Sequence, residues 1–383
     1  MMTDDGGDDD GRPTRTSKAQ ADTEFLVLRA FASPSAFDAA KTVAFLQSGL
    51  RHLDAAFSTL DSSRAWLCYW ILHGLALLRV EVDDNVKRDM VAHFTRCQCA
   101  DGGFGGGPMQ LAHTAPTYAS VMALVTVGTL DAFKVVNRPL LYRYLLSLKD
   151  GEGGFRVHHD GEADSRGMYT VLAVAAMVNV LTPELADGAE DWVKRSQGFD
   201  GGVGGEPGNE SHGGYAYCAL ASMVLLGRAH EALDLDAMAS WLAQRQMPVE
   251  GGFQGRTNKL VDSCYSFWQG ACFPLLRLAD PDADYAWLDE AALHHYVLGA
   301  CAHASGGLRD KPGAGRDFYH TCYALSGLSV TMLDGQGTSS GVDLARTDPV
   351  FNVEVNKLAR AQAFFAGFRC DHDELLEAAA RLS

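Results

Sequence analysis

Three residues of the types that bind zinc are candidates for a metal site in this sequence. Asp262 and Cys264 are separated by a single residue, and His320 lies further along the chain. Carboxylate, thiolate and imidazole are all zinc ligands, and three protein ligands leave one tetrahedral position open. An open position is typical of a catalytic metal rather than a structural one. Because D-x-C is a short motif, spacing alone gives this prediction little weight.

Basic residues surround the candidate metal ligands in sequence. The stretch GGFQGRTNKLVDSCYSFW contains Arg256, Lys259 and Tyr265, and His212 lies one repeat earlier. Arginine forks onto phosphate oxygens, lysine supplies a point charge, and helix N-termini add oriented N–H groups. In a chain with a net charge of −16, this cluster predicts a seat for a diphosphate. The alternative is a solvated loop with ordinary basic residues.

Aromatic residues form a third group near the same positions. Its members are Trp66, Trp70, Tyr169, Tyr215, Tyr265, Trp268 and Tyr319. Any one of them alone is more typical of an ordinary core position. Together, and beside an anion seat, they suit a long apolar ligand that carries a charged head.

A repeat must position these groups. Glycine pairs recur about every 50 residues, at Gly102-Gly103, Gly153-Gly154, Gly201-Gly202, Gly251-Gly252 and Gly306-Gly307. Each pair follows an amphipathic helical segment, where glycine suits the left-handed residue that ends a helix. A loop and a more apolar helix come next, and an aromatic marks its first turn at Tyr118, Tyr169, Tyr215, Tyr265 and Tyr323. An earlier segment, RAWLCYWILHGLALL, carries Trp66 at the matching place.

Six helical hairpins with one apolar and one amphipathic partner predict an all-α fold. We expect an α/α barrel, or toroid, with six inner and six outer helices; an open α-solenoid is the alternative, since stacking alone does not fix closure. The residues three before the marker aromatics would then ring one mouth of the barrel, at Ser63, Ala115, Arg166, His212, Asp262 and His320. Polar residues at these helix starts could also be simple caps.

Composition and the N-terminus limit the remaining possibilities. Residues 1–22 are rich in Asp and Gly and are expected to form a disordered acidic tail, followed by a single domain over 23–383. The first residues lack an apolar stretch, so no export signal is expected, and nine scattered cysteines suit a reducing, cytoplasmic setting. The acidic balance argues against nucleic-acid binding. No apolar run reaches the roughly 18 residues of a membrane span, so no membrane insertion is expected.

Several long stretches resemble the β subunits of protein farnesyltransferases, within the protein prenyltransferase β-subunit family. They are SRAWLCYWILHGL, GGFGGGPMQLAHTAPTYA, GGVGGEPGNESHGGYAYC, EGGFQGRTNKLVDSCYSFWQ and GGLRDKPGAGRDFYHTCYALSGLS, and the resemblance covers roughly residues 45 to 370. It implies a six-plus-six α/α barrel that transfers a farnesyl group from farnesyl diphosphate to the cysteine of a C-terminal C-a-a-X motif. It also implies an obligate α subunit as partner.

The resemblance further implies roles for individual residues. The zinc ligands match Asp262, Cys264 and His320, and the diphosphate is held by residues matching His212, Arg256, Lys259 and Tyr265. The isoprenoid lies against residues matching Trp66, Arg166, Tyr169, Tyr215, Cys218 and Trp268. The acceptor peptide meets those matching Trp70 and Tyr319, and Asp310 matches a carboxylate linked to magnesium. Tyr265 and Lys259 would act in the transfer itself. One departure is Ala314, where the family usually has a lysine near the diphosphate.

Two other functions stay open at this point. A geranylgeranyltransferase type I β subunit is similar but carries a small residue where this chain has Trp66, so Trp66 and Asp310 favour farnesyl over geranylgeranyl. A non-catalytic helical-repeat scaffold could bind an apolar peptide in the same cavity. A scaffold would have no reason to place Asp262, Cys264 and His320 in register.

Overall fold

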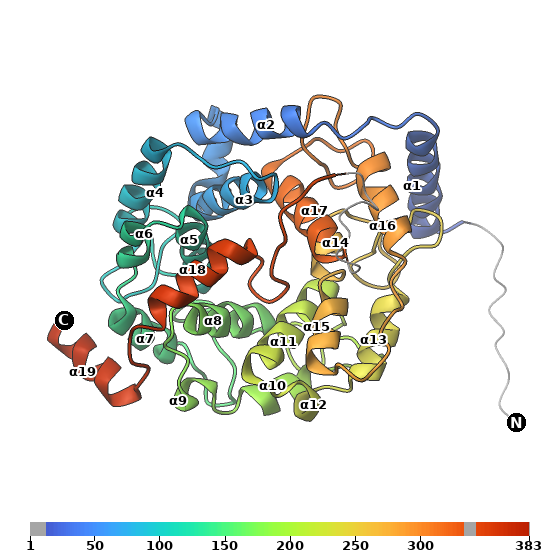
Figure 1. Ribbon diagram of the computed structural model, residues 1–383. Helices are drawn as coiled ribbons and strands as arrows, with labels where there is room; N and C mark the ends of the chain where they lie inside the picture. Colours follow the sequence, from blue (N-terminus) through green and yellow to red (C-terminus); the bar gives the residue numbers. More distant parts are fainter. Residues whose placement is uncertain (1–12, 333–341, 383) are drawn as a thin grey trace, which may run out of the picture.

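The computed structural model describes residues 13–332 and 342–382, and these residues form two concentric rings of helices (Figure 1). The inner ring consists of α3 (Arg64–Leu77), α5 (Thr114–Val127), α8 (Ser165–Met177), α11 (Gly213–Leu226), α14 (Tyr265–Trp268) with α15 (Cys272–Ala279), and α17 (Phe318–Val330). The outer ring consists of α2 (Ala39–Arg51), α4 (Asp84–Cys97), α7 (Arg138–Ser147), α10 (Ala189–Ser196), α13 (Leu235–Ala243), and α16 (Glu290–His295) with the π-helix η2 (Tyr296–Ala300).

Contacts between neighbouring inner helices close the inner ring. Helix α3 contacts α5, α5 contacts α8, α8 contacts α11, and α11 contacts α14 and α15. The ring is completed because α14 contacts α17 and α17 contacts α3. The predicted α/α barrel is therefore confirmed, and the open solenoid is excluded.

Hydrophobicity explains which helix goes inside. Along α5 nearly every residue is apolar or small, and all but Ala115 are buried. A helix that is apolar all round needs protein on every side. Outer helix α10 instead buries only Ala189, Trp192, Val193 and Ser196, which lie on one face. The fifth inner helix is broken rather than continuous, because residues 269–271 form a turn between α14 and α15.

The glycine pairs allow close approach between repeats. Gly102 has a φ of 110°, and a Cβ there would lie 2.1 Å from the carbonyl group of Leu140 at the start of the next outer helix. Gly201 repeats this relationship with Ala237, at 2.2 Å. The first glycine of these pairs is therefore required both by its left-handed backbone and by the neighbouring helix.

A C-terminal segment enters the barrel from the end where the inner helices finish. The amide of Ala345 donates to the carbonyl of Leu77, the last residue of α3, and the Ser329 hydroxyl, near the end of α17, donates to the Ala345 carbonyl. The segment then runs inward to a tip at residues 349–352 and leaves into α18 (Val355–Phe365). We call residues 345–354 the plug.

The N-terminal part differs from the expectation. Helix α1 (Arg15–Ala32) begins before residue 23, so the expectation of a disordered tail over residues 1–22 does not hold from Arg15 onward. The Thr14 side chain caps the helix, Val27 is fully buried, and α1 contacts η2. Residues 1–12 lie outside the described part of the chain. Within that part, no helix is long and apolar enough to cross a membrane.

The other helices connect the rings or lie at the periphery. They are the 3-10 helix η1 (Ala55–Ser63), α6 (Leu130–Val135), α9 (Pro183–Ala186), α12 (Ala229–Ala232) and α19 (His372–Leu382). Helix α19 packs against α7, where the hydroxyl of Tyr142 lies 2.6 Å from Nδ1 of His372.

Candidate active site

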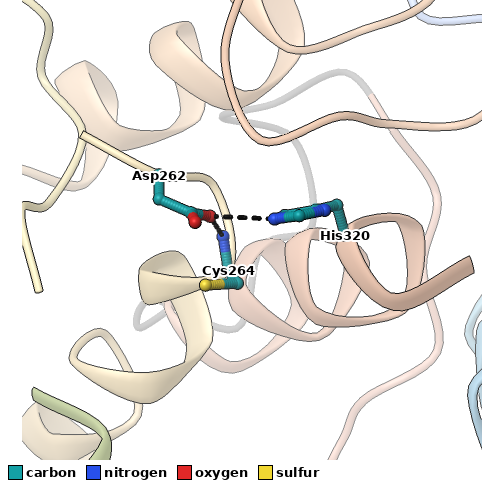
Figure 2. A group of neighbouring side chains, drawn as sticks. All are labelled: Asp262, Cys264 and His320. Carbon is teal, nitrogen blue, oxygen red and sulfur yellow. Dashed lines mark hydrogen bonds and ion pairs between the residues drawn. The ribbon is translucent and has the colours of Figure 1, made fainter. Parts of the chain in front are cut away.

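The three predicted metal ligands converge from two adjacent inner helices (Figure 2). Asp262 and Cys264 precede α14, and His320 lies in the first turn of α17. One ligand atom from each residue can be chosen so that all lie within 4.8 Å of one another. The Nε2 atom of His320 is 3.3 Å from Oδ1 of Asp262, which also accepts the Cys264 amide at 2.8 Å. Among the residues described, this is the only such group of three ligand-type side chains.

The electrostatics of this triad favour a cation at its centre. Burial raises the pKa of Asp262, but its hydrogen bond and ion pair with His320 outweigh burial and hold it below its ordinary value. Burial lowers the pKa of His320, yet Asp262 and Asp317 outweigh it and raise this pKa to about 10. Burial and the Asp262 charge raise the pKa of the Cys264 thiol well above its ordinary range. A bound metal ion would lower the pKa of the Cys264 thiol instead, because a cation stabilises a thiolate.

Asp317 is a candidate functional residue that the sequence pattern did not single out. Its Oδ2 atom lies 2.6 Å from Nδ1 of His320, and its Oδ1 atom accepts the His320 amide at 2.7 Å. Asp317 is thus both the N-cap of α17 and the partner that fixes the imidazole. Metal-binding histidines almost always donate their other ring N–H to such a partner. The local signal was an aspartate three residues before the candidate histidine.

These residues fit a zinc ion by donor chemistry and by setting. They provide one carboxylate oxygen, one thiol sulfur and one imidazole nitrogen, with the imidazole already oriented by Asp317. Three donors of these types leave the open position of a catalytic zinc site. Cys264 is 3% exposed, so the donor sulfur is sheltered.

A second polar pair lies beside the triad. Nε2 of His212 is 3.0 Å from the Tyr265 hydroxyl, and Nδ1 of His212 accepts the Gly214 amide at 3.0 Å. Because Nδ1 accepts this bond, it carries no proton, so Nε2–H donates to Tyr265. Burial and the Arg256 charge lower the pKa of His212, in keeping with a neutral ring. The Tyr265 hydroxyl is then free to donate its own proton to an anion.

The predicted basic residues are only partly available. The Arg256 guanidinium pairs with Glu210, while the exposed Lys259 ammonium has no ion pair among the residues that the structure describes. Arg166 pairs with Asp164 at 2.5 Å and with Glu162 at 3.1 Å. An incoming anion must therefore compete with carboxylates for both arginines.

An apolar pocket adjoins this polar pair. It measures about 220 Å³ and is lined by Arg166, His212, Gly214, Tyr215, Cys218, Tyr265, Trp268 and Tyr319. The lining thus combines the anion-binding candidates with most of the predicted isoprenoid contacts. The Tyr319 hydroxyl accepts the Trp268 indole N–H at 3.0 Å, which fixes two of the walls.

Three predicted aromatic contacts lie elsewhere. Trp66 lines a separate pocket of about 660 Å³, together with Ser63, His113 and Pro116 among others. Trp70 lies between the two pockets, since its ring contacts both Trp66 and Tyr319. Tyr169 is 3% exposed, and its hydroxyl donates to the plug.

Asp310 is close to the triad but is not free. Both of its carboxylate oxygens lie within 2.6 Å of the Lys311 ammonium, at 2.5 and 2.6 Å. Burial and the nearby Asp262 charge raise the pKa of Asp310, and Lys311 opposes this. The Asp310 carbonyl accepts the Ser263 amide, which ties this loop to the metal ligands. Ala314 donates its amide to Lys311 in the same turn.

The predicted ring of equivalent positions needs correction. The residues that cap inner helices α5, α8, α11 and α17 are His113, Asp164, His212 and Asp317. Only His212 is both a predicted ring position and an N-cap. The predicted positions Ala115, Arg166 and His320 each lie two or three residues after the N-cap residue of their helix. The capping side chain, rather than the marker aromatic, determines where each helix begins.

Comparisons with known proteins agree with this geometry. Residues 37–353 match a family model described as "Prenyltransferase alpha-alpha toroid domain". The chain is 42% identical over 349 residues to a protein farnesyltransferase subunit beta of Arabidopsis thaliana, an alignment that covers 76% of this chain and 72% of the relative. It is 31% identical to a geranylgeranyl transferase type-1 subunit beta of the same plant, over 80% of this chain and 88% of the relative.

A solved structure shares the fold. Candida albicans protein geranylgeranyltransferase-I complexed with GGPP superposes with a TM-score of 0.71, over 85% of this chain and 98% of that one. The sequences are 21% identical, so this likeness bears on the fold alone. It agrees with the closed double ring described above.

Proposed function

Because the chain belongs to the β-subunit family of protein farnesyltransferases, we propose that it is the catalytic subunit that transfers farnesyl from farnesyl diphosphate to a protein cysteine. The acceptor is the cysteine of a C-terminal C-a-a-X motif. The bond between C1 of the prenyl group and the diphosphate oxygen breaks, and a thioether bond forms between C1 and the acceptor sulfur. The diphosphate leaves with the electron pair of the broken bond.

The observation that carries this proposal is the position of the triad beside the aromatic pocket. Cys264 directly precedes Tyr265, and Asp262 lies three residues before it. Tyr265 itself lines the pocket with His212, Trp268 and other residues. A nucleophile held at the triad would therefore face a chain held in the pocket. Effective molarity gained by such positioning is a major source of rate.

Each polar residue then has a defined task. Asp262, Cys264 and His320 would hold zinc, and Asp317 would keep the His320 ring in place. Bound zinc would favour the thiolate form of an acceptor cysteine at neutral pH. His212 orients the Tyr265 hydroxyl, which donates to the charge that develops on the departing diphosphate. Arg256 and Lys259 bind the same anion. No general base is assigned, because an acceptor thiol bound to zinc would already have lost its proton to solvent.

Magnesium fits less well than zinc. The resemblance links Asp310 to magnesium, but both oxygens of this carboxylate are paired with Lys311. Magnesium demands near-octahedral oxygen coordination, with carboxylate and phosphate ligands. The Asp310 carboxylate is already engaged by the Lys311 ammonium. We therefore assign no step to magnesium.

We further propose that the chain works as a heterodimer with a prenyltransferase α subunit and in the cytoplasm. The family is the support for the partner. Nine cysteines, all free, suit a reducing compartment.

The alternative chain length is geranylgeranyl, and the farnesyltransferase relative is the more similar of the two at 42% against 31% identity. The test is turnover of a C-a-a-X peptide by the co-expressed heterodimer with the C15 or the C20 diphosphate. We expect kcat/KM to favour C15 by at least about 10-fold. One extra or missing methylene in an apolar pocket changes kcat/KM by about 10- to 200-fold. A preference for C20 would assign the chain to the geranylgeranyl class. If neither diphosphate is transferred, the non-catalytic repeat scaffold would be the remaining alternative.

A further inference from the structure

Six aromatic rings form a layer inside the barrel, just beneath the two pockets. They come from successive inner helices and are Tyr69, Tyr118, Tyr169, Tyr217, Phe267 and Tyr323. The five tyrosines lie five or six residues after the N-cap residue of their helix, and Phe267 lies three residues after Cys264 in the short helix α14. Each ring contacts the next along this order, with centroids 5.0–6.0 Å apart. All six are at most 3% exposed. We call this layer the collar.

Four of the collar residues grip the tip of the plug. The hydroxyl of Tyr69 donates to the Asn352 carbonyl at 2.7 Å, and that of Tyr118 to the Phe351 carbonyl at 2.8 Å. The hydroxyl of Tyr169 donates to the Val350 carbonyl at 2.8 Å.

Tyr217 completes the grip, since its hydroxyl lies 3.0 Å from the carbonyls of both Pro349 and Val350. Four consecutive carbonyls of a buried loop thus receive hydrogen bonds from side chains. Such a loop would otherwise bury unpaired polar groups.

The plug is also held from its side. Asn352 has a φ of 49°, a left-handed conformation that asparagine tolerates better than most residues. Its Oδ1 atom lies 3.0 Å from Nε2 of His73, which in turn lies 3.1 Å from the Ser326 hydroxyl. The position of the tip is therefore fixed by contacts with the inner helices.

The collar is continuous with the walls of both pockets. Trp66 contacts Tyr69 and Tyr118 at 5.9 and 5.7 Å between ring centroids, and Trp268 contacts Tyr217 and Tyr323 at 5.3 and 4.5 Å. The pocket that Trp268 lines measures only about 220 Å³, below the roughly 300–1,000 Å³ of typical ligand pockets. A prenyl chain therefore needs space beyond it, and the collar limits how much space is available.

We infer that the plug, through the collar, sets the length of prenyl chain that the barrel accepts, with Tyr217 and Asn352 as positioning residues. This inference rests on the proposed function and deepens it. While the plug is gripped, the collar rings cannot move toward the far end of the barrel, and the available depth is short. When one hydrogen bond between the collar and the plug is lost, the unpaired plug carbonyl moves toward another partner. The collar rings can then shift, and the space above them becomes long enough for a longer prenyl chain.

The chain supplies a matched pair for the test. Tyr217→Phe removes one hydroxyl that grips the plug and keeps the ring. Tyr323→Phe removes one hydroxyl from the same layer. Among the described residues the tyrosine hydrogen bonds to the plug come from Tyr69, Tyr118, Tyr169 and Tyr217, and none comes from Tyr323. Asn352→Gly weakens the attachment of the plug without changing a collar residue. Glycine keeps the left-handed backbone but loses the contact with His73.

The experiment measures kcat/KM of the heterodimer for the C15 and C20 diphosphates with one C-a-a-X peptide, and the melting temperature of each variant. We expect Tyr217→Phe and Asn352→Gly to lower the C15-to-C20 ratio by about 10-fold, chiefly through the KM for C20, and Tyr323→Phe to leave the ratio within about twofold of wild type. Equal ratios in all four folded proteins would overturn the inference, as would an equal fall in Tyr323→Phe.

Failure of the inference can be told from failure of the proposed function. Wild-type protein that transfers neither chain would contradict the proposed function itself. Wild-type protein that transfers farnesyl, while Tyr217→Phe and Asn352→Gly fold and keep the wild-type ratio, would contradict only the role of the plug. Direct binding of each diphosphate, followed by intrinsic tryptophan fluorescence, gives a second readout that does not depend on turnover.

Discussion

The Oδ2 atom of Asp317 lies 2.6 Å from Nδ1 of His320, so the imidazole presents Nε2 to Asp262 and to any metal bound there. The same aspartate caps α17 by accepting the His320 amide at 2.7 Å. Helix initiation and ligand orientation are thus performed by one side chain. This coupling makes the metal-binding geometry a direct consequence of where α17 begins.

The first prediction concerns that coupling. Asp317→Asn keeps a side chain that can cap the helix but removes the negative charge beside His320. We expect zinc affinity to fall about 10- to 100-fold, with little loss of helix content. Competition titration with a zinc chelator measures the affinity. Asp234→Asn, at the exposed N-cap of α13, is the control, and an equal fall in that variant would refute a specific role for Asp317.

The second prediction concerns the hydroxyl of Tyr265. Tyr265→Phe removes a donor that His212 orients toward the anion seat. We expect the single-turnover rate to fall roughly 10- to 100-fold, because the donor acts mainly on charge that develops in the transition state. Affinity for the prenyl diphosphate should change by less than about threefold on the same argument.

The matched control for this change is Tyr285→Phe. The Tyr285 hydroxyl donates to Asp236 on the outer helix α13, away from the pocket lining. Its removal should leave the single-turnover rate unchanged. If Tyr265→Phe weakened binding and left the rate intact, Tyr265 would be a ground-state contact only.

The third prediction concerns chain length at Trp66. Trp66 is a bulky ring that contacts the collar residues Tyr69 and Tyr118 and lines the larger pocket. Trp66→Thr removes this bulk, and we expect the C20 diphosphate to become a substrate at a rate comparable with C15. Steady-state kinetics with both diphosphates provides the measurement, with the exposed Trp287→Thr as control. A Trp66→Thr enzyme with full C15 selectivity would show that the ring does not limit chain length.

The fourth prediction is a pH dependence of stability that arises at His73. Burial lowers the pKa of His73 from 6.5 to about 4, partly offset by the Asn352 hydrogen bond, and the side chain is 0% exposed. Between these two pH values the unfolded chain binds more protons than the folded one, so acid favours unfolding. Above about pH 6.5 the ionisation of His73 does not reduce the free energy of unfolding. Between about pH 6.5 and pH 4 it lowers the free energy of unfolding by about 1.4 kcal/mol per pH unit.

Denaturant unfolding at pH 5, 6 and 7 checks this dependence. A His73→Gln variant lacks the titrating ring, so its stability should fall less steeply with acid, by about 1.4 kcal/mol per pH unit. His230, which is mostly exposed, gives the control variant His230→Gln, whose slope should match wild type. Parallel pH profiles for His73→Gln and wild type would mean that His73 is not buried in its neutral form.

Much of this architecture could be predicted from the sequence, because it depends on local rules. Glycine pairs such as Gly201-Gly202 mark helix ends, and the apolar character of segments such as 114–127 marks the inner ring. The three candidate metal ligands were expected to lie together, and the structure brings them together, since Asp262 and His320 start neighbouring inner helices. Their role as metal ligands stays a prediction. Ring closure depends on contact between α3 and α17, at opposite ends of the sequence, and local pattern does not fix it.

Other features depend on long-range contacts that no local pattern reveals. The collar tyrosines share a residue type but differ in their contacts, because the Tyr217 hydroxyl donates to the plug and the Tyr323 hydroxyl does not. Which hydroxyl finds a carbonyl is decided by residues 349–352, far away in sequence. The N-cap position of Asp317 is a local signal, but counting back from the marker aromatic Tyr323 leads to His320, three residues after Asp317.

The central claim is that Asp262, Cys264 and His320 hold the catalytic metal. The most direct measurement is zinc content and C15 transfer of the heterodimer, for wild type, Cys264→Ala and the buried control Cys272→Ala. One zinc per heterodimer with transfer activity in wild type and Cys272→Ala, and the loss of both in folded Cys264→Ala, is the predicted result. Stoichiometric zinc and full activity in Cys264→Ala would contradict the claim and place the metal elsewhere.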